Sequence, residues 1–126
     1  MSSEKGEKMG NQKFYEIVAS HPKPGKEAEY NQWYDQHVQD VFRYNSMNKV
    51  TRTYCFYPLE PRGSYQRKSD CPQYITIYEF DSKDDLLDFF KELSKGTFDD
   101  PDQGTDEVLF ELDWAAGYES GVMLGK

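Results

Sequence analysis

The chain has 126 residues, a formal net charge of −8 and a hydrophobic content of 37%, which fit one small domain. An acidic chain without a basic stripe suits neither nucleic acid nor an anionic membrane surface as a partner, and no apolar run approaches the roughly 20 residues of a membrane span. Aromatic residues make up 16% of the chain, which favours a small-molecule pocket or an interface lined by rings.

Residues 1–12 are rich in Gly, Ser, Lys and Glu and lack the apolar segment of a secretory signal. We therefore expect a disordered leader followed by a single folded domain over residues 13–126. Cys55 and Cys71 form no metal-type cluster. Two free thiols in the reducing cytoplasm are the main expectation, and a disulfide between them across a loop is the alternative.

The first half of the domain predicts a strand, a helix and a second strand. Residues 13–20 favour a strand, and the Pro22, Pro24 and Gly25 turn that follows breaks it sharply. Apolar residues with a period of 3.6 predict a helix from about Lys26 to Arg43. Residues 49–57 are rich in β-branched and aromatic side chains, which predicts the second strand.

The second half predicts a strand, a helix and a last strand, separated by long polar loops. Residues 74–80 alternate cleanly and predict a third strand after a long loop over residues 58–73. The next segment has the signals of a helix, with Ser82 or Asp81 as its cap and Gly96 at its end. An acidic loop over residues 97–107 then leads to a strand predicted at residues 108–114.

This βαββαβ order is that of a ferredoxin-like α+β fold, with four antiparallel strands and two helices on one face. The strands at residues 74–80 and 108–114 carry apolar side chains on both of their faces. Since monomers rarely expose an apolar patch of several hundred Å², we expect the second face of the sheet to pair with another copy.

His37 is the most informative residue of the first predicted helix, because it lies on the helix's apolar stripe. A structural role would have its ring bonded to a backbone carbonyl or to Asp40, three residues later. A functional role would make it a general acid or base, since its ordinary pKa of about 6.5 suits proton transfer near neutrality. Its neighbours on the stripe are Tyr30, Trp33, Tyr34, Val38 and Val41.

The segment over residues 21–42 resembles the dimeric α+β barrel superfamily and, within it, the EthD-like and related small proteins. That resemblance implies a homodimer whose two sheets pair into a barrel. The superfamily includes muconolactone isomerases, polyketide cyclases, cofactor-free monooxygenases and haem-degrading enzymes. The matching positions are Pro22, Pro24, Gly25, Glu27, Tyr30, Asn31, Trp33, Tyr34, Asp35, His37, Asp40 and Val41.

Together, the residues and the resemblance predict a cofactor-independent isomerase, cyclase, dehydratase or lyase that acts on a cyclic or polyketide-like molecule. A cofactor-free or haem-linked monooxygenase and a non-catalytic ligand-binding protein are the alternatives. We expect no metal site, because the chain has two histidines and no carboxylate cluster with metal-ligand spacing. The predicted catalytic residues are His37, Tyr34 and Asp40, and the predicted substrate-binding residues are Tyr30, Trp33, Arg52 and Tyr78.

Overall fold

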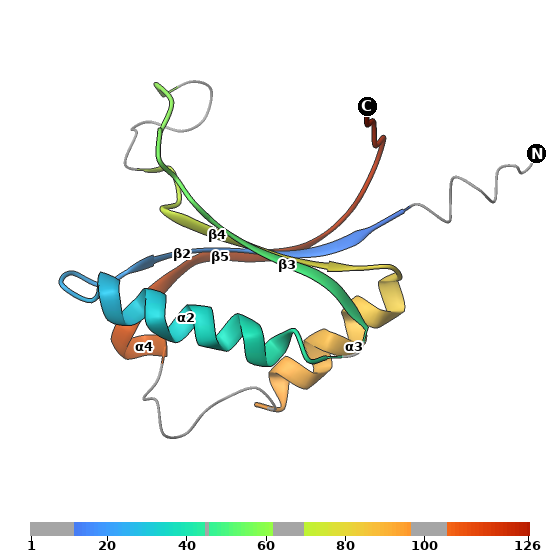
Figure 1. Ribbon diagram of the computed structural model, residues 1–126, viewed down its shortest axis with the longest axis horizontal. Coiled ribbons are helices and arrows are strands. Elements are labelled where there is room, and N and C mark those ends of the chain that lie inside the picture. Colours follow the sequence, from blue (N-terminus) through green and yellow to red (C-terminus); the bar gives the residue numbers. More distant parts are fainter. Residues whose placement is uncertain (1–11, 45, 62–69, 97–105) are drawn as a thin grey trace, which may run out of the picture.

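The computed structural model describes residues 12–44, 46–61, 70–96 and 106–126. These residues form a four-stranded antiparallel sheet in the order β3-β4-β2-β5. The helices lie together on one face of it (Figure 1), which confirms the predicted ferredoxin-like α+β fold. The elements are β2 (Phe14–Pro22), α2 (Glu27–Val41), β3 (Met47–Tyr54), β4 (Tyr74–Phe80), α3 (Lys83–Ser94), α4 (Asp106–Leu109) and β5 (Phe110–Glu119).

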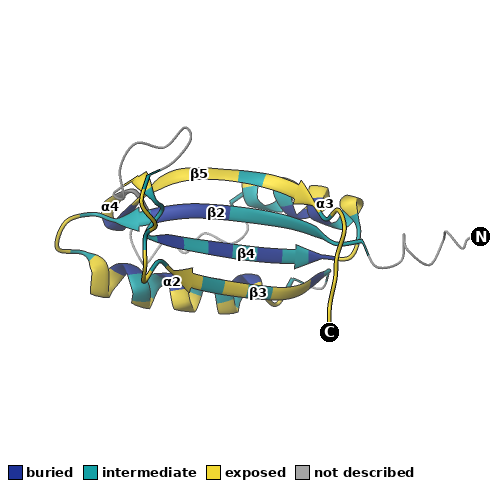
Figure 2. Cartoon of the chain, turned by 90° about the horizontal axis from the view of Figure 1, so that it is seen from above, coloured by how far each residue is buried: buried dark blue, intermediate teal, exposed yellow. Residues whose placement is uncertain are grey.

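The second face of the sheet carries no helix among the described residues. Figure 1 shows the segment that follows β3 and the C-terminal segment projecting on this side. In Figure 2, β2 and β4 are the more buried strands, while β3 and β5 are exposed edges. On the second face, Ile17 pairs with Ile77 and Ala19 with Ile75, and all three isoleucines are half-buried. Pairing of this face with another copy stays a prediction.

Local sequence signals explain where α3 begins and ends. The side chain of Ser82 accepts a hydrogen bond from the backbone N–H of Asp85 at 3.1 Å, which confirms Ser82 as the cap. Asp84 and Asp85 place negative charge in the first turn, where the helix dipole favours it. Gly96 follows the helix with a φ of 75°, a conformation that favours glycine.

The core lies between the sheet and the helices and has two clusters. The cluster under α3 holds the side chains that join α3 to β2 and β4, and the cluster under the start of α2 is mainly aromatic. The first consists of Val18, Val41, Met47, Tyr78, Phe80, Leu86 and Phe89, and the second of Tyr30, Tyr34, Tyr74, Leu109 and Phe110.

The last strand differs from its prediction in both bounds and facing. Leu109 belongs to the short helix α4, and the strand runs on to Glu119. The pairing of β2 with β5 shifts register between Ala19 and Ser20, so that Ala19 pairs with Trp114 and Ser20 with Leu112. Such a bulge turns the residues beyond it to the other face. The predicted regular alternation from residue 108 to 114 was therefore wrong.

The remaining element bounds agree with prediction to within a few residues. The strand at Tyr74–Phe80 has the predicted bounds, and the first helix is shorter than predicted at both ends. Most of the predicted leader and residues 97–105 of the acidic loop lie outside the described residues. No helix in the described part of the chain has the length and apolar character needed to cross a membrane.

Candidate functional site

Tyr34 and Tyr78 meet between α2 and the middle of the sheet, as parts of one hydrogen-bonded group. Each is only 3% exposed. Burial raises the pKa of Tyr34, whose hydroxyl also hydrogen-bonds with Thr76 and Tyr78. Burial likewise raises the pKa of Tyr78 well above its ordinary value. Both phenols therefore stay protonated near neutrality and can act as hydrogen-bond donors.

His37 lies on α2 beside this tyrosine pair and is stacked on a tryptophan. Its ring is parallel to that of Trp33, with centroids 4.6 Å apart and 12° between the planes. The Tyr34 ring meets the imidazole edge-on at 5.8 Å. Trp33 also contacts Phe110 of β5, with ring centroids 5.5 Å apart. Trp33 and His37 are both half-buried, so this stack forms the accessible side of the candidate site.

Asp40 lies three residues after His37 on α2, the position from which it was predicted to orient the imidazole. Its Oδ1 atom accepts a hydrogen bond from Gln36 Nε2 at 3.1 Å and lies 3.5 Å from Arg43 Nη1. Asp40 thus has partners on its own helix surface. An orienting role toward the imidazole remains a prediction.

Arg52 projects from β3 toward α2, where three tyrosine rings surround its guanidinium. The guanidinium carbon is 4.4 Å from the ring centroid of Tyr34, 5.3 Å from that of Tyr30 and 5.1 Å from that of Tyr74. Its side chain is 14% exposed. Nε and Nη2 are buried without a hydrogen-bond partner among the described residues. The electron-rich faces of the rings stabilise such a cation.

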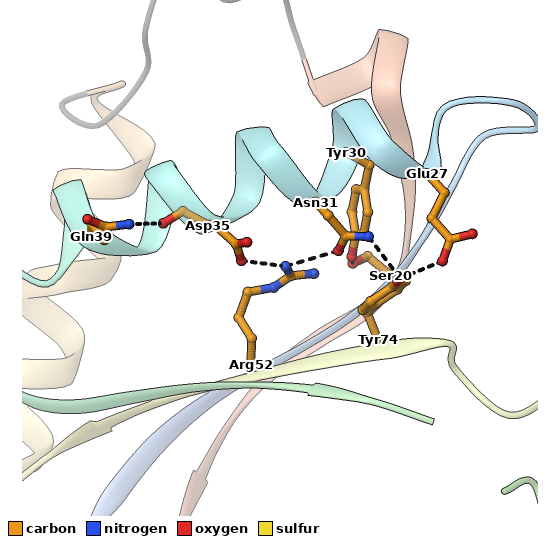
Figure 3. Close-up of polar contacts among 8 residues, drawn as sticks. All are labelled: Ser20, Glu27, Tyr30, Asn31, Asp35, Gln39, Arg52 and Tyr74. Carbon is orange, nitrogen blue, oxygen red and sulfur yellow. Dashed lines mark hydrogen bonds and ion pairs between the residues drawn. The ribbon is translucent and has the colours of Figure 1, made fainter. Parts of the chain in front are cut away.

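The same guanidinium is the centre of a polar network that joins the sheet to α2 (Figure 3). Arg52 Nη1 donates to Asn31 Oδ1 at 3.2 Å and to Asp35 Oδ1 at 3.0 Å. Asn31 Nδ2 donates to the Tyr74 hydroxyl at 3.0 Å, and that hydroxyl donates to Glu27 Oε2 at 2.7 Å. The charge of Arg52 therefore already has a partner in Asp35, which limits its use for a substrate.

Sequence reasoning named Arg52 but missed this network. One signal could have revealed it: Glu27, Asn31 and Asp35 follow at intervals of four residues, so they share one face of the helix. Tyr30, a predicted substrate-binding residue, lies next to the network and is fully buried. Its hydroxyl is 2.8 Å from Ser20 Oγ, so the structure places it as a link between α2 and β2.

Glu16 is a second residue that sequence reasoning missed. It lies on β2 between Tyr78 of β4 and Gly117 of β5. Burial raises the pKa of its carboxyl to about 7. The available signal was its place in the alternation of β2, where Phe14, Glu16 and Val18 share one face.

A separate hollow of about 660 Å³ lies at the end of the sheet where β2 ends and β4 begins. His21 stands at its wall, with Nδ1 2.9 Å from Asp113 Oδ1 and Nε2 3.3 Å from Glu111 Oε1. Cys55 and Cys71, both free thiols, also line it. Within the described ranges, no three metal-ligating side chains are grouped in a way that could hold an ion.

Comparison with known proteins gives the fold and no closer relationship. No family model and no curated protein matches the sequence. One similar structure is a Bordetella bronchiseptica protein that has been assigned as an antibiotic biosynthesis monooxygenase. Its sequence is 16% identical and its TM-score is 0.58, and the match covers 90% of this chain and 100% of that chain. The hydroxynitrile lyase of Passiflora edulis is 13% identical with a TM-score of 0.56, and the match covers 92% of this chain and 99% of that chain.

A third similar structure is MhuD with two manganese protoporphyrin IX molecules in each active site. It is 12% identical with a TM-score of 0.54, over 90% of this chain and 97% of that chain. At these identities the likeness establishes a shared ferredoxin-like fold, a fold that carries small-molecule enzymes among these relatives. The narrower EthD-like resemblance stays a prediction.

Proposed function

We propose that the protein is a cofactor-independent enzyme that transfers protons on a cyclic or polyketide-like molecule. Isomerisation, cyclisation, dehydration and lyase cleavage are the reactions in this class. The observation that carries the proposal is the half-buried Trp33–His37 stack beside Tyr34. It brings a titratable imidazole, an apolar ring and a phenol donor to one side of α2, and these are the groups that such a reaction requires.

Each residue has a defined part in the proposed reaction. His37 accepts or returns a proton, and Trp33 fixes the plane of the imidazole and offers apolar surface to the substrate. Tyr34 donates a hydrogen bond to a carbonyl or enolate oxygen, which takes the place of one of its present partners, Thr76 or Tyr78. Arg52, 4.4 Å from the Tyr34 ring centroid, holds that ring in position.

A monooxygenase is the second candidate, since two of the similar structures are described as a monooxygenase and as a porphyrin-bound protein. It would use either no cofactor or haem. His37, through its half-buried imidazole, would hold the haem, which would supply oxygen activation. A non-catalytic ligand-binding protein is the third candidate.

We also propose that the protein is located in the cytoplasm, in keeping with its two free thiols.

We test the proposal with 2-tetralone, a flat bicyclic ketone with acidic C–H bonds next to its carbonyl. NMR spectroscopy follows the exchange of these hydrogens with deuterium in heavy water. The protein should accelerate the exchange, and His37→Gln should reduce the acceleration about 100-fold or more. His21→Gln, on the other face of the sheet, is the matched control and should keep it. Equal exchange with and without the protein contradicts the enzymatic proposal.

Two further measurements separate the alternatives. Oxygen consumption in the presence of a phenolic probe such as 1-naphthol supports a monooxygenase, and its absence counts against one. A Soret absorption band that forms with haemin in the wild type, and is lost in His37→Gln, supports the haem-linked form. Saturable fluorescence quenching of 1-naphthol without turnover of either probe supports the binding protein.

We also propose that the second face of the sheet pairs with the same face of another copy. Half-buried Ile17, Ile75 and Ile77 are the supporting observation. Light scattering should then give a mass of about twice 14.8 kDa. Ile77→Lys should produce a monomer, whereas Leu87→Lys, at an exposed position of α3, should not. A wild-type monomer at micromolar concentration contradicts this proposal.

A further inference from the structure

Glu16 is a carboxylic acid on the covered face of a central strand. Residues of β2 alternate between the two faces, and Phe14 and Val18, its neighbours on the same face, pack in the core under α3. Ser20, further along this face, hydrogen-bonds with Tyr30 of α2. The side chain of Glu16 therefore points toward the helices, at the place where a strand of this kind ordinarily carries an apolar residue.

The two strands beside β2 give Glu16 unequal neighbours. On β4 its partner is Tyr78, and directly opposed side chains of an antiparallel pair lie about 5 Å apart at Cβ. On β5 its partner is Gly117, which has no side chain and is exposed, as is Ala115 beside it. A Cβ atom at Gly117 would lie 3.5 Å from the ring of Phe90. Glu16 thus has the phenol of Tyr78 on one side. On the other side it has the exposed backbone of Gly117, with the ring of Phe90 above it.

No described side chain compensates the burial of this carboxyl. Glu16 takes part in none of the hydrogen bonds or ion pairs found among the described residues, and burial is what raises its pKa to about 7. The titratable and charged groups close to it are Tyr78 of β4, Tyr34 of α2, which hydrogen-bonds to Tyr78, and Arg52 of β3, whose charge also acts on Tyr78. The nearby residues of α3, Leu86 and Phe90, are apolar, and β5 presents Gly117. An uncompensated acid is costly in a purely structural role and is typical of catalytic sites.

We propose that Glu16 is the proton acceptor of this site and that its substrates are flat, enolisable ketones. The inference rests on the proposed function and deepens it. The carboxylate takes the proton from the carbon next to the carbonyl, the C–H electron pair forms a C=C bond, and the carbonyl π pair moves onto oxygen. Tyr34 and Tyr78 hold that enolate oxygen by hydrogen bonds. Return of the proton from the Glu16 carboxylic acid to the same or another carbon restores the carboxylate and completes an isomerisation without any oxidant.

The first test reads the carboxyl directly. In protein labelled with ¹³C at the glutamate carboxyl, one resonance should titrate near pH 7 and be absent from Glu16→Gln. Addition of 2-tetralone should shift that resonance. A Glu16 signal that titrates in the ordinary range for a glutamate, or that 2-tetralone leaves unmoved, overturns the inference.

The second test compares deuterium exchange of 2-tetralone in three variants. Glu16→Gln should lose the acceleration about 100-fold or more, and Glu16→Asp, which keeps the carboxyl but withdraws it, should lose less. Glu79→Gln, on the other face of the sheet, is the matched control and should keep the wild-type rate. The wild-type rate should rise with pH through about 7, and this rise should be absent from Glu16→Gln.

The outcomes separate this inference from the function on which it rests. Loss in Glu16→Gln supports the role of Glu16: with loss in His37→Gln the two residues share the proton transfer, and without it Glu16 alone carries the step that the proposed function gave to His37. Acceleration that survives in folded Glu16→Gln and is lost in His37→Gln overturns the inference and leaves the proposed function standing. A wild-type protein that gives no acceleration overturns both.

Discussion

Arg52 and Glu16 are two charged side chains on the same, helix-covered face of the sheet, and their surroundings differ. Arg52 has an ion pair with Asp35, a hydrogen bond to Asn31 and three tyrosine rings around its guanidinium. Glu16 has neither an ion pair nor a hydrogen bond among the described residues, and burial raises its pKa to about 7. Burial alone therefore does not distinguish a structural charge from a chemical one.

Arg52 and Glu16 differ in whether other groups compensate the lost hydration of the buried charge. A charge removed from water destabilises the fold unless partners replace its hydration. Arg52 has such partners, and they link β3 and β4 to α2 by a continuous series of bonds that ends at Glu27. We infer that this network stabilises the position of α2, and with it the Trp33–His37 stack. Glu16 is held at a cost in stability, which is how a group poised to exchange protons is commonly held.

Removal of the Arg52 cation should give the largest change in stability. Arg52→Met keeps much of the side chain's length but loses the ion pair and the three cation–ring contacts. We expect the free energy of unfolding, measured with urea, to fall by about 2–4 kcal/mol. Arg43→Met is the control, because Arg43 is 79% exposed and its pair with Asp40 should contribute little. Equal stabilities for the two variants would show that the ion pair with Asp35 and the three tyrosine rings contribute nothing.

Removal of the Glu16 charge should raise the free energy of unfolding, whereas removal of the Arg52 charge lowers it, and the size of the gain should depend on pH. The raised pKa means that the folded protein binds a proton that the unfolded chain has already lost between pH 4.5 and about 7. Stability therefore falls as pH rises through this window. Glu16→Gln should be more stable than wild type by about 1–3 kcal/mol at pH 8, and the gain should shrink toward pH 5.

Urea unfolding at both pH values measures this gain. Glu29→Gln, at an exposed position of α2, is the control and should change stability by less than about 0.5 kcal/mol. A Glu16→Gln protein that is less stable than wild type at pH 8 would mean that the carboxylate has a partner in solution. Glu16 would then belong with Arg52 as a structural charge.

The fold could be predicted from the sequence because its signals are local. The alternation at residues 74–80, the periodic helices and the Ser82 cap each depend on neighbouring residues, and all agree with the structure. The bulge at Ala19 and Ser20 could not be predicted in this way, because it depends on how β2 meets β5 from the far end of the chain.

The candidate site shows the same limit. The stack of Trp33 with His37 follows from their spacing of four residues on one helix, so sequence could place them together. The pairing of Asp35 with Arg52 joins residues 17 apart in the chain, and no pattern announces it. Glu16 was missed because both faces of β2 mix polar and apolar residues. Alternation grouped it with Phe14 and Val18, but only the neighbouring strands and the packing under α3 identified that face as the helix-covered one.

The smallest predicted effect sharpens the comparison by asking whether the Arg52 network acts as one unit. Tyr74→Phe removes the hydroxyl that accepts from Asn31 and donates to Glu27, and leaves the ring in place beside the guanidinium. We expect a loss of about 1 kcal/mol, against almost none for Tyr54→Phe, whose side chain is exposed.

Combining Tyr74→Phe with Arg52→Met then tests the connection through Asn31. If Asn31 transmits the contact, the loss in the double variant should be smaller than the sum of the single losses by about 0.5 kcal/mol or more. Strict additivity would mean that two independent pairs, Arg52 with Asp35 and Tyr74 with Glu27, happen to lie side by side. Arg52 would then differ from Glu16 only in having direct partners, and those partners would not form a network that positions α2.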